Sequence, residues 1–308
     1  MILVLGSSKD SVFPQVTREL RDRGHPFIAI DEDSSSRYKV RSEGSNGHSV
    51  FRVLGDDGNG RTPVTSIFVR HAVTRSLEPE TMRRMGQLQG ELNIMLCAAR
   101  CPVLNRPANA VSNYSKPYQA MLLAQAGFDV PRSLVTNSPE AARSFWEECR
   151  GEVIFKGVSN ATTLAQLLSA AGLERLALLP CSPTLFQEYI AGDDYRVHVI
   201  GDEAFVTRVV ARDVDYRRAA VMQDKDLQVE PGELDAAVLE RCVAFTKSLG
   251  LIASGIDFKQ QASGRLVALE LNPYPQFTFY DRRSGQPITR AVVDYLIRNQ
   301  APDTNVFA

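Results

Sequence analysis

The sequence lacks the features that mark membrane, secreted and nucleic-acid-binding proteins. It contains no apolar run of about 18 residues or more, and the short apolar segment Met1 to Leu5 lacks the basic start of a signal peptide. Its 35 basic and 36 acidic residues give a net charge of -1, so no excess of positive charge indicates a nucleic-acid or membrane surface. We therefore expect a cytoplasmic protein that binds neither nucleic acid nor membrane.

Several common site patterns are also missing. The five cysteines are scattered and include no CxxC pair, which argues against a disulfide framework and a cysteine zinc site. The four histidines show no metal spacing and no recognisable catalytic triad. No GxGxxG and no GxxxxGK[ST] occurs, so the sequence has neither a dinucleotide fingerprint nor a P-loop.

The 308 residues, 44% of them hydrophobic, suffice for two or three packed subdomains of mixed α/β and α+β class. Residues 1–107 begin with a Rossmann-like unit, and a polar insertion over 32–63 contains a short apolar segment typical of a β-meander. Residues 108–185 alternate helices and strands. Residues 186–308 favour strands over 185–189, 195–200 and 204–212, a helix over 234–249, a hairpin and a last helix over 288–299.

The segment Gly255 to Pro273 predicts a β-hairpin with one acidic face. Two alternating runs flank the turn-forming residues 261–264. If Gln260 faces Arg265, then Asp257 faces Ala268 and has Glu270 as a diagonal neighbour, about 7 to 8 Å away at Cα. Alternation places Asn272 on this face too. The apolar side chains of the opposite face are Ile256, Phe258, Val267, Leu269 and Leu271.

Two carboxylates and an amide carbonyl on one face are hard ligands suited to Mg²⁺. The alternative is a solvated polar face without a ligand, and strand parity alone does not decide between the two.

Further polar motifs precede the hairpin in a definite order. Lys116 begins a helix, Lys156 ends an apolar strand, and a strand over 187–190 leads into Asp194-Tyr195-Arg196. With the hairpin, this order resembles the ATP-grasp superfamily of carboxylate ligases, and most closely its RimK-like and graspetide branch, which ties side chains of ribosomal peptides together. The supporting stretches are Asn105 to Pro107, Lys116 to Pro131, Leu134 to Asn137, Phe186 to Ile190, Asp213 to Arg217 and Leu271 to Pro287.

The resemblance covers nearly the whole chain and implies an ATP-grasp fold. Residues 1–107 would form a Rossmann-like pre-grasp domain, 108–185 a central lobe, and 186–308 a carboxy-terminal lobe that closes with it over ATP. The loop over 157–163, where many relatives have a glycine-rich flap, has one glycine. The segment after Asn272 also differs from the glycine-bearing loop of relatives. A homodimer is one of the oligomeric states that the resemblance leaves open.

The resemblance also implies roles for individual residues. Lys116 and Lys156 would contact the ATP phosphates, and Asp257, Glu270 and Asn272 would hold Mg²⁺, as two ions. The strand Gln187, Glu188, Tyr189 and Ile190 would frame adenine through the backbone of Glu188 and Ile190. Asp194 would take the ribose hydroxyls, and Ile154 and Leu269 would sandwich the base.

Arginines complete the implied catalytic set. Arg196 shares a strand face with Asp194, where a guanidinium can bind a phosphate or a developing acyl phosphate. Arg208 and Arg212 share a parity and could extend this positive surface, although a solvated face fits them equally well.

The implied reaction phosphorylates a carboxylate with ATP, and an amine or hydroxyl then displaces phosphate to give an amide or ester. No protein nucleophile is needed. The expected substrate is a peptide or an amino-acid derivative. The alternatives are a small-molecule amino-acid or dipeptide ligase and a non-catalytic ATP-binding module, and both lysines and the three metal-type ligands argue against the module.

Overall fold

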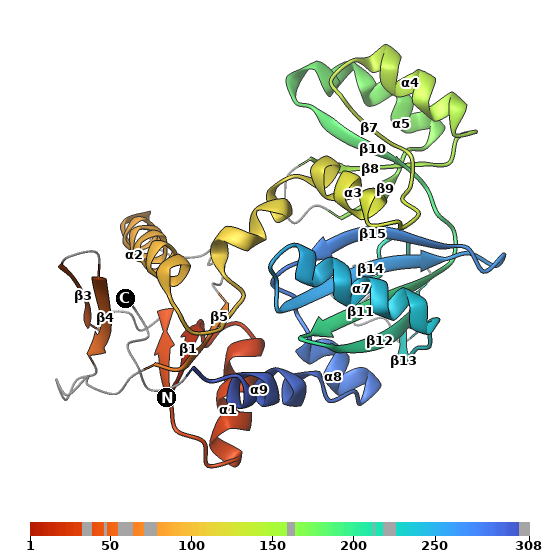
Figure 1. Ribbon diagram of the computed structural model, residues 1–308. Helices are drawn as coiled ribbons and strands as arrows, with labels where there is room; N and C mark the ends of the chain where they lie inside the picture. Colours follow the sequence, from red (N-terminus) through yellow and green to blue (C-terminus); the bar gives the residue numbers. More distant parts are fainter. Residues whose placement is uncertain are drawn as a thin grey trace.

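The computed structural model describes residues 1–32, 39–45, 48–54, 64–70, 79–158, 164–211, 213–217 and 226–301. The strands in these residues form three larger sheets and a separate two-stranded one (Figure 1). The first sheet is parallel and the next two are antiparallel, in agreement with the predicted α/β and α+β class. None of the described helices is long and apolar enough to cross a bilayer.

A parallel sheet organises the amino-terminal part. Its strands, in the order β2-β1-β5-β6, are β2 (Phe27–Asp31), β1 (Ile2–Gly6), β5 (Ser66–Arg70) and β6 (Val103–Leu104). β1 is buried throughout, as expected for an apolar strand covered on both faces. The helices of this part are α1 (Val12–Asp22) and α2 (Pro79–Ala98). β3 (Lys39–Ser45) and β4 (His48–Leu54) pair antiparallel within the predicted insertion.

An antiparallel sheet organises the central lobe. Its strands, in the order β7-β10-β8-β9, are β7 (Ser133–Thr136), β10 (Thr184–Glu188), β8 (Val153–Gly157) and β9 (Gln166–Leu167). The apolar core of this lobe lies between the sheet and three helical segments, which are α4 (Pro139–Glu148), α5 (Ala170–Glu174) and η3 (Arg175–Cys181). The predicted boundary at residue 185 therefore cuts β10, which pairs with both β7 and β8.

A larger antiparallel sheet organises the carboxy-terminal lobe. Its strands, in the order β13-β12-β11-β14-β15, are β13 (Gln228–Pro231), β12 (Glu203–Val210), β11 (Asp193–Ile200), β14 (Ala253–Gln260) and β15 (Leu266–Asn272). One face packs against α7 (Ala236–Ser248) and α3 (Lys116–Gln125). α3 follows η2 (Pro107–Tyr114) in the stretch predicted for the central lobe, but its Leu123 is buried in the core of this larger sheet.

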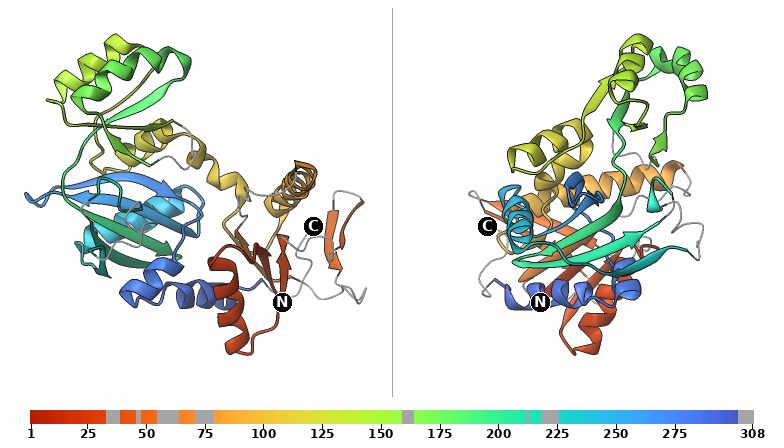
Figure 2. Two further views of the ribbon diagram at one scale, coloured as in Figure 1. Left: turned by 180° about the vertical axis from the view of Figure 1, so that it is seen from behind. Right: turned by 90° about the vertical axis from the view of Figure 1, so that its right-hand side faces the viewer.

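Alternation along β11 divides that sheet into an apolar face and a polar face. Val197 and Val199 enter the core beneath α7, whereas Asp194, Arg196 and His198 are buried on the other side. α8 (Thr278–Ser284) and α9 (Ile288–Arg298) follow β15. α9 returns to the amino-terminal part and lies beside α1, as both views in Figure 2 show.

The register of the predicted hairpin differs from the sequence expectation. Gln260 pairs with Leu266, and the ladder shifts between Phe258 and Asp257, so that Asp257 lies directly opposite Glu270. Leu269 is the extra residue of this bulge, and one extra residue reverses side-chain parity on the bulged strand. The prediction that Asp257 faces Ala268 is therefore wrong, as is the placement of Leu269 on the core face, whereas Asn272 still shares the face of Asp257.

One buried side chain ties the chain after β6 to the carboxy-terminal sheet. The Asn105 amide nitrogen donates to the carbonyls of Ala253, at 2.6 Å, and Pro273, while its oxygen accepts from the backbone of Ile252 at 2.8 Å and Ala253 at 2.9 Å. Asn105 is 2% exposed, so water cannot replace these bonds. It holds the start of β14 beside the end of β15.

We expect Asn105→Ala to lower the free energy of unfolding by about 2 to 4 kcal/mol, because it leaves several buried backbone groups without partners. The measurement is urea denaturation. Asn109→Ala is the control, since this side chain makes an exposed bond to the Gly250 carbonyl and should cost only about 1 kcal/mol. Equal losses in both variants would contradict the assigned importance of Asn105.

Candidate active site

A cleft lies between the central lobe and the polar face of the carboxy-terminal sheet. The predicted site residues that line it are Ile154, Lys156, Gln187, Glu188, Tyr189, Ile190, Asp194, Asp257, Leu269 and Glu270. Ala165, Lys259 and the segment Val214 to Arg217 complete its wall.

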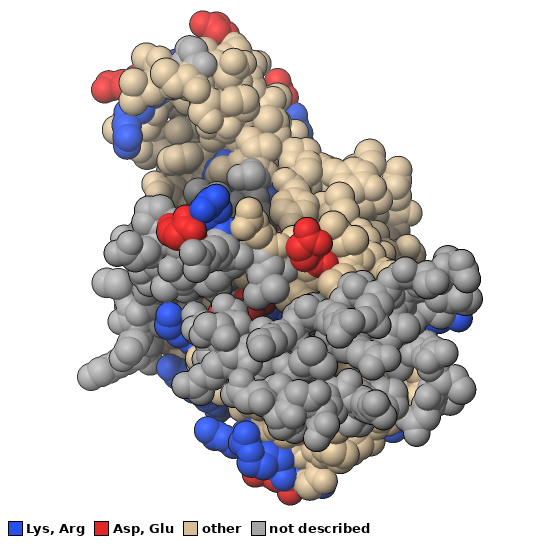
Figure 3. Space-filling model, turned by 90° about the vertical axis from the view of Figure 1, so that its left-hand side faces the viewer, with Lys and Arg blue, Asp and Glu red and all other residues tan. Residues whose placement is uncertain are grey.

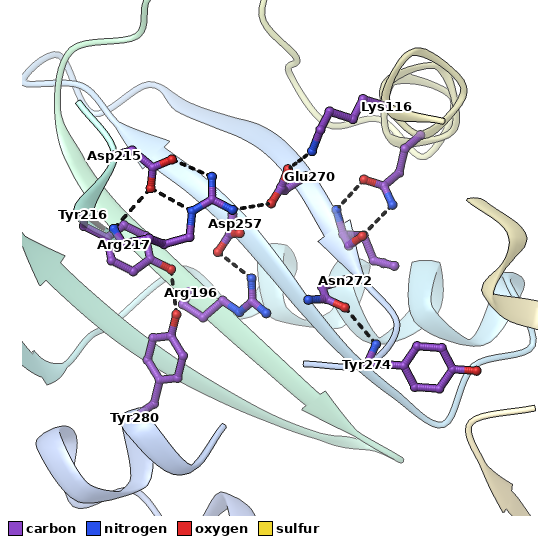
Figure 4. A network of polar contacts seen from close by, with 12 residues as sticks. Lys116, Arg196, Asp215, Tyr216, Arg217, Asp257, Glu270, Asn272, Tyr274 and Tyr280 are labelled. Carbon is purple, nitrogen blue, oxygen red and sulfur yellow. Dashed lines mark hydrogen bonds and ion pairs between the residues drawn. The ribbon is translucent and has the colours of Figure 1, made fainter. Parts of the chain in front are cut away.

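Three basic side chains from different elements surround the two hairpin carboxylates (Figure 4). Arg196 of β11 lies 2.7 Å from Asp257, and Lys116 at the start of α3 lies 3.0 Å from Glu270. Arg217 lies 3.7 Å from Glu270 and also pairs with Asp215, which positions it between two carboxylates.

The two opposed carboxylates differ in their ionisation. Burial raises the pKa of Asp257, although Arg196 opposes this effect. Burial also acts to raise the pKa of Glu270, but Lys116, Lys156 and Arg217 together outweigh it and lower that pKa to about 2. Glu270 is therefore the more firmly ionised of the two.

Lys156 is a buried cation. It is 9% exposed and has no ion-pair partner among the described residues. Burial lowers the pKa of its ammonium group, and the nearby Glu270 opposes this only in part. Because an unpaired buried charge is costly, this position favours an anion that enters from outside the protein.

Arg196 lies behind the wall of the cleft. Its guanidinium carbon is 5.9 Å from the centre of the Tyr280 ring, and the Tyr280 hydroxyl is 2.6 Å from that of Tyr216. Arg196 is 5% exposed and its buried Nε makes no hydrogen bond. The structure thus brings Arg196 to the metal-type residues, as strand parity predicts, but beneath Asp257 and not in the open cleft.

The predicted nucleotide-binding residues come from both lobes, with Gln187 and Glu188 on β10 and Asp194 on β11 of the sheet that carries Asp257. Asp194 accepts a hydrogen bond of 2.8 Å from Lys259, and burial raises the pKa of Asp194 to about 7 despite this lysine. The Glu188 side chain accepts from the backbone of Arg132, and the Gln187 amide donates to Ser133. Both side chains thus make hydrogen bonds within the central lobe. The backbone at the end of β10 and just after it can still contact a ligand.

Arg208 is not part of this site. It pairs with Tyr195 across β11 and β12, which places it on the face opposite that of Arg196. Its guanidinium forms ion pairs with Asp193 and Glu230 at 2.6 and 2.8 Å. The prediction that Arg208 extends the positive surface of the site is therefore wrong, because parity along one strand does not say which face meets the cleft. Arg212 and the flap residues 159–163 lie outside the described residues.

Hydrogen bonds to the backbone around Asn272 help to hold the predicted metal-binding residues in place. No group of three Asp, Glu, His or Cys side chains suited to a metal ion occurs among the described residues. The third predicted ligand, Asn272, offers an amide oxygen instead. Asn272 accepts from the Tyr274 backbone at 2.9 Å, and Gln119 of α3 bonds both backbone groups of Leu271 beside it. The buried Oδ1 of Asp257, although 2.7 Å from Arg196, makes no aligned hydrogen bond. Two directly opposed carboxylates and an amide oxygen suit Mg²⁺.

Three functional candidates were given no role by the sequence analysis. Lys259 follows Asp257 by two residues on β14, and alternation could have placed it in the cleft. Tyr216 and Arg217 lie in the stretch Asp213 to Arg217 that supported the resemblance, but this segment pairs with no strand, so no local pattern indicates where their side chains lie.

The face of the molecule shown in Figure 3 carries both basic and acidic side chains among its described residues.

Two antiparallel lobes that meet over a charged cleft define an ATP-grasp fold. The sequence model described as the RimK-like ATP-grasp domain matches residues 114–296, and the chain belongs to this family. The Probable alpha-L-glutamate ligase of Haemophilus influenzae is 24% identical over 184 residues, which are 57% of this chain and 60% of that protein. The chain thus matches less than two thirds of the length of these curated relatives.

Solved structures match over nearly the whole chain. The ATP-grasp ligase PsnB complexed with a minimal precursor is 29% identical, with a TM-score of 0.81, and the match covers 97% of this chain and 98% of PsnB. PsnB complexed with a phosphomimetic precursor variant, Mg and ADP is 30% identical, with a TM-score of 0.78 and the same coverage. The macrocyclase MdnC of Microcystis aeruginosa MRC, bound with precursor peptide MdnA, is 19% identical, with a TM-score of 0.79 over 97% of this chain and 99% of MdnC, and so supports the fold alone.

We expect Lys156→Met to raise the free energy of unfolding of the ligand-free protein by about 0.5 to 2 kcal/mol, the usual gain when a costly functional group is replaced. The methionine keeps the apolar stem and removes the buried unpaired charge. Urea denaturation without nucleotide tests this. Lys247→Met is the control, because Lys247 is 55% exposed and pairs with Asp202, and it should change stability by less than about 1 kcal/mol. A loss of stability in Lys156→Met would mean that Lys156 has a stabilising partner.

Proposed function

We propose that this protein is a Mg²⁺-dependent ATP-grasp ligase that activates a carboxylate as an acyl phosphate and joins it to an amine or hydroxyl. The observation that carries the proposal is the buried Lys156, which has no ion-pair partner among the described residues and lies in the cleft with Arg217, close to Glu270 and its partner Lys116. Cations gathered where solvent is partly excluded favour a polyphosphate.

The nucleotide would lie with its base between Ile154 and Leu269 and its phosphates at the lysines. Backbone groups of Glu188 and Ile190 would bind the adenine edge, and Asp194, oriented by Lys259, would take the ribose hydroxyls. Asp257, Glu270 and Asn272 would hold Mg²⁺, which would neutralise charge on the transferring phosphoryl group.

In the first step, a carboxylate oxygen of the substrate attacks the γ-phosphorus and the bond to the ADP oxygen breaks. Lys156 and Arg217 offset charge on the phosphates, and Arg196 stabilises Asp257 and the charge that develops near it. In the second step, an amine or hydroxyl attacks the acyl carbon, loses its proton, and phosphate leaves. The enclosed cleft protects the acyl phosphate from water.

A peptide is the substrate class that the comparisons favour. PsnB is complexed with precursor peptides in structures to which this chain is similar. The curated relatives are named glutamate ligases, so the addition of glutamate to a peptide or small molecule is the second candidate. Both reactions use the same parts of the cleft, and the acceptor distinguishes them.

We expect turnover to form ADP and phosphate, since the cations surround the position of a γ-phosphoryl group. The assay supplies ATP and Mg²⁺ with peptides encoded beside the gene, or with glutamate and a glutamate-ended peptide. Mass spectrometry separates the candidates: a cyclising ligase removes one water per bond formed, whereas a glutamate ligase adds a glutamate residue. AMP and pyrophosphate as products would remove the acyl-phosphate assignment.

Arg196 and Arg208 lie on opposite faces of the same sheet, so their alanine variants form a matched pair. We expect Arg196→Ala to lower kcat by about a hundred- to thousand-fold with a smaller effect on ATP affinity, because its charge acts mainly in the transition state. Arg208→Ala should leave kcat within about threefold, as expected for a surface change of ±0.5 kcal/mol. Turnover and calorimetric ATP affinity are measured for both, and equal effects of the two changes would refute the role of Arg196.

A further inference from the structure

Gly255 lies on β14 where the Arg196 side chain crosses that strand. It pairs with His198 of β11 on one side and with Asn272 of β15 on the other. Its φ angle is not in the left-handed region, so the backbone conformation does not require glycine here. The reason for a glycine must therefore be space.

The missing side chain makes room for the guanidinium group. A Cβ on Gly255 would lie 2.1 Å from Nη2, 2.4 Å from Cζ and 2.6 Å from Nε of Arg196, whereas ordinary contact begins at 3.4 Å. The guanidinium thus lies directly against the Gly255 α-carbon. At Gly90 of α2, by contrast, an added Cβ would meet nothing within 4 Å.

The surroundings of Arg196 leave it little freedom to move away. Asp257 holds Nη1 at 2.7 Å, and the Tyr280 ring lies over the guanidinium. His198, on the same face of β11, is fully buried and packs edge-on against Tyr280, with ring centres 4.7 Å apart. Burial and the neighbouring Arg196 lower the pKa of His198, so its uncharged ring does not repel the guanidinium.

We propose that Gly255 is a positioning residue, which lets the Arg196 guanidinium lie flat on β14 and so fixes it beside Asp257. An added methyl group would have to displace the guanidinium by about 1 Å, and a displacement of that size in a reacting site can cost about a hundredfold in rate. The catalytic part of this inference rests on the proposed function, whereas the steric part does not.

The steric part is tested by a double-mutant cycle on stability in the ligand-free protein. Gly255→Ala should lower the urea midpoint, and the same substitution in an Arg196→Ala background should shift the midpoint no more than Gly90→Ala does. Arg196→Gln, which is shorter but still polar, serves as a second background if Arg196→Ala does not fold. Additive shifts in both backgrounds would overturn the inference, because the methyl group would then clash with something other than Arg196.

The catalytic part is tested by ADP release with ATP, Mg²⁺ and the substrates that turn over in the assay described above, and by calorimetric ATP affinity. We expect Gly255→Ala to lower the rate about ten- to a hundredfold while ATP affinity changes less than about threefold. In the Arg196→Ala background, Gly255→Ala should have no further effect on the rate.

The outcomes distinguish the positioning role of Gly255 from the catalytic role of Arg196. A coupled stability cycle with a slow Gly255→Ala enzyme supports the positioning role. If Arg196→Ala itself releases ADP at the wild-type rate, the catalytic role of Arg196 fails, and with it the catalytic part of this inference. If Arg196→Ala lowers the rate, and Gly255→Ala lowers it further by its full factor in that background, only the positioning role of Gly255 is overturned.

Discussion

The site depends on two carboxylates that lie side by side and are partly buried. Asp257 and Glu270 face each other across β14 and β15, and two negative charges so close together and partly shielded from water are tolerated only when cations compensate them. Arg196, Lys116 and Arg217 supply this compensation from β11, α3 and the segment after β12. Electrostatic attraction therefore adds to packing in holding each of these elements near the hairpin. In the proposed reaction, a bound nucleotide and metal would replace these internal ion pairs.

The hairpin is in turn held by neutral side chains. Gln119 bonds both backbone groups of Leu271, and Asn105 bonds the strand ends on either side. A site supported by buried, fully bonded amides keeps its geometry better than one on a free loop. The amino-terminal part and α3 therefore position a site to which they contribute only Lys116.

Alternation in the sequence was enough to predict much of the site. It placed Asp257 with Glu270 and Asn272, and Asp194 with Arg196, on shared strand faces, and the structure agrees. The details that depend on distant partners could not be predicted in this way. The bulge at Leu269 has no local sequence marker, and Arg208 lies on the wrong face because parity fixes relative sides only.

Helix boundaries depend mainly on nearby residues and could be predicted from the sequence. Lobe limits depend on contacts between distant residues and could not. The helix start at Lys116 and the last helix, predicted over 288–299, agree with α3 and α9 to within a residue, and Ser115 caps α3 through a local hydrogen bond. The limit at residue 185 falls inside β10, because the pairing of β10 with β7 and β8 is decided by tertiary contacts. Likewise, only packing shows that α3 belongs with the larger sheet.

The buried charge of Lys156 has a consequence for the lifetime of the protein in a cell. A ligand that binds only the folded state stabilises it by about 2.7 kcal/mol at a hundred times its dissociation constant. Because the buried Lys156 has no ion-pair partner among the described residues, a bound nucleotide that pairs with it would add more stability than packing alone suggests. Proteases act on the unfolded fraction, so the abundance of this protein should follow the local supply of nucleotide, and starvation would remove the idle enzyme first.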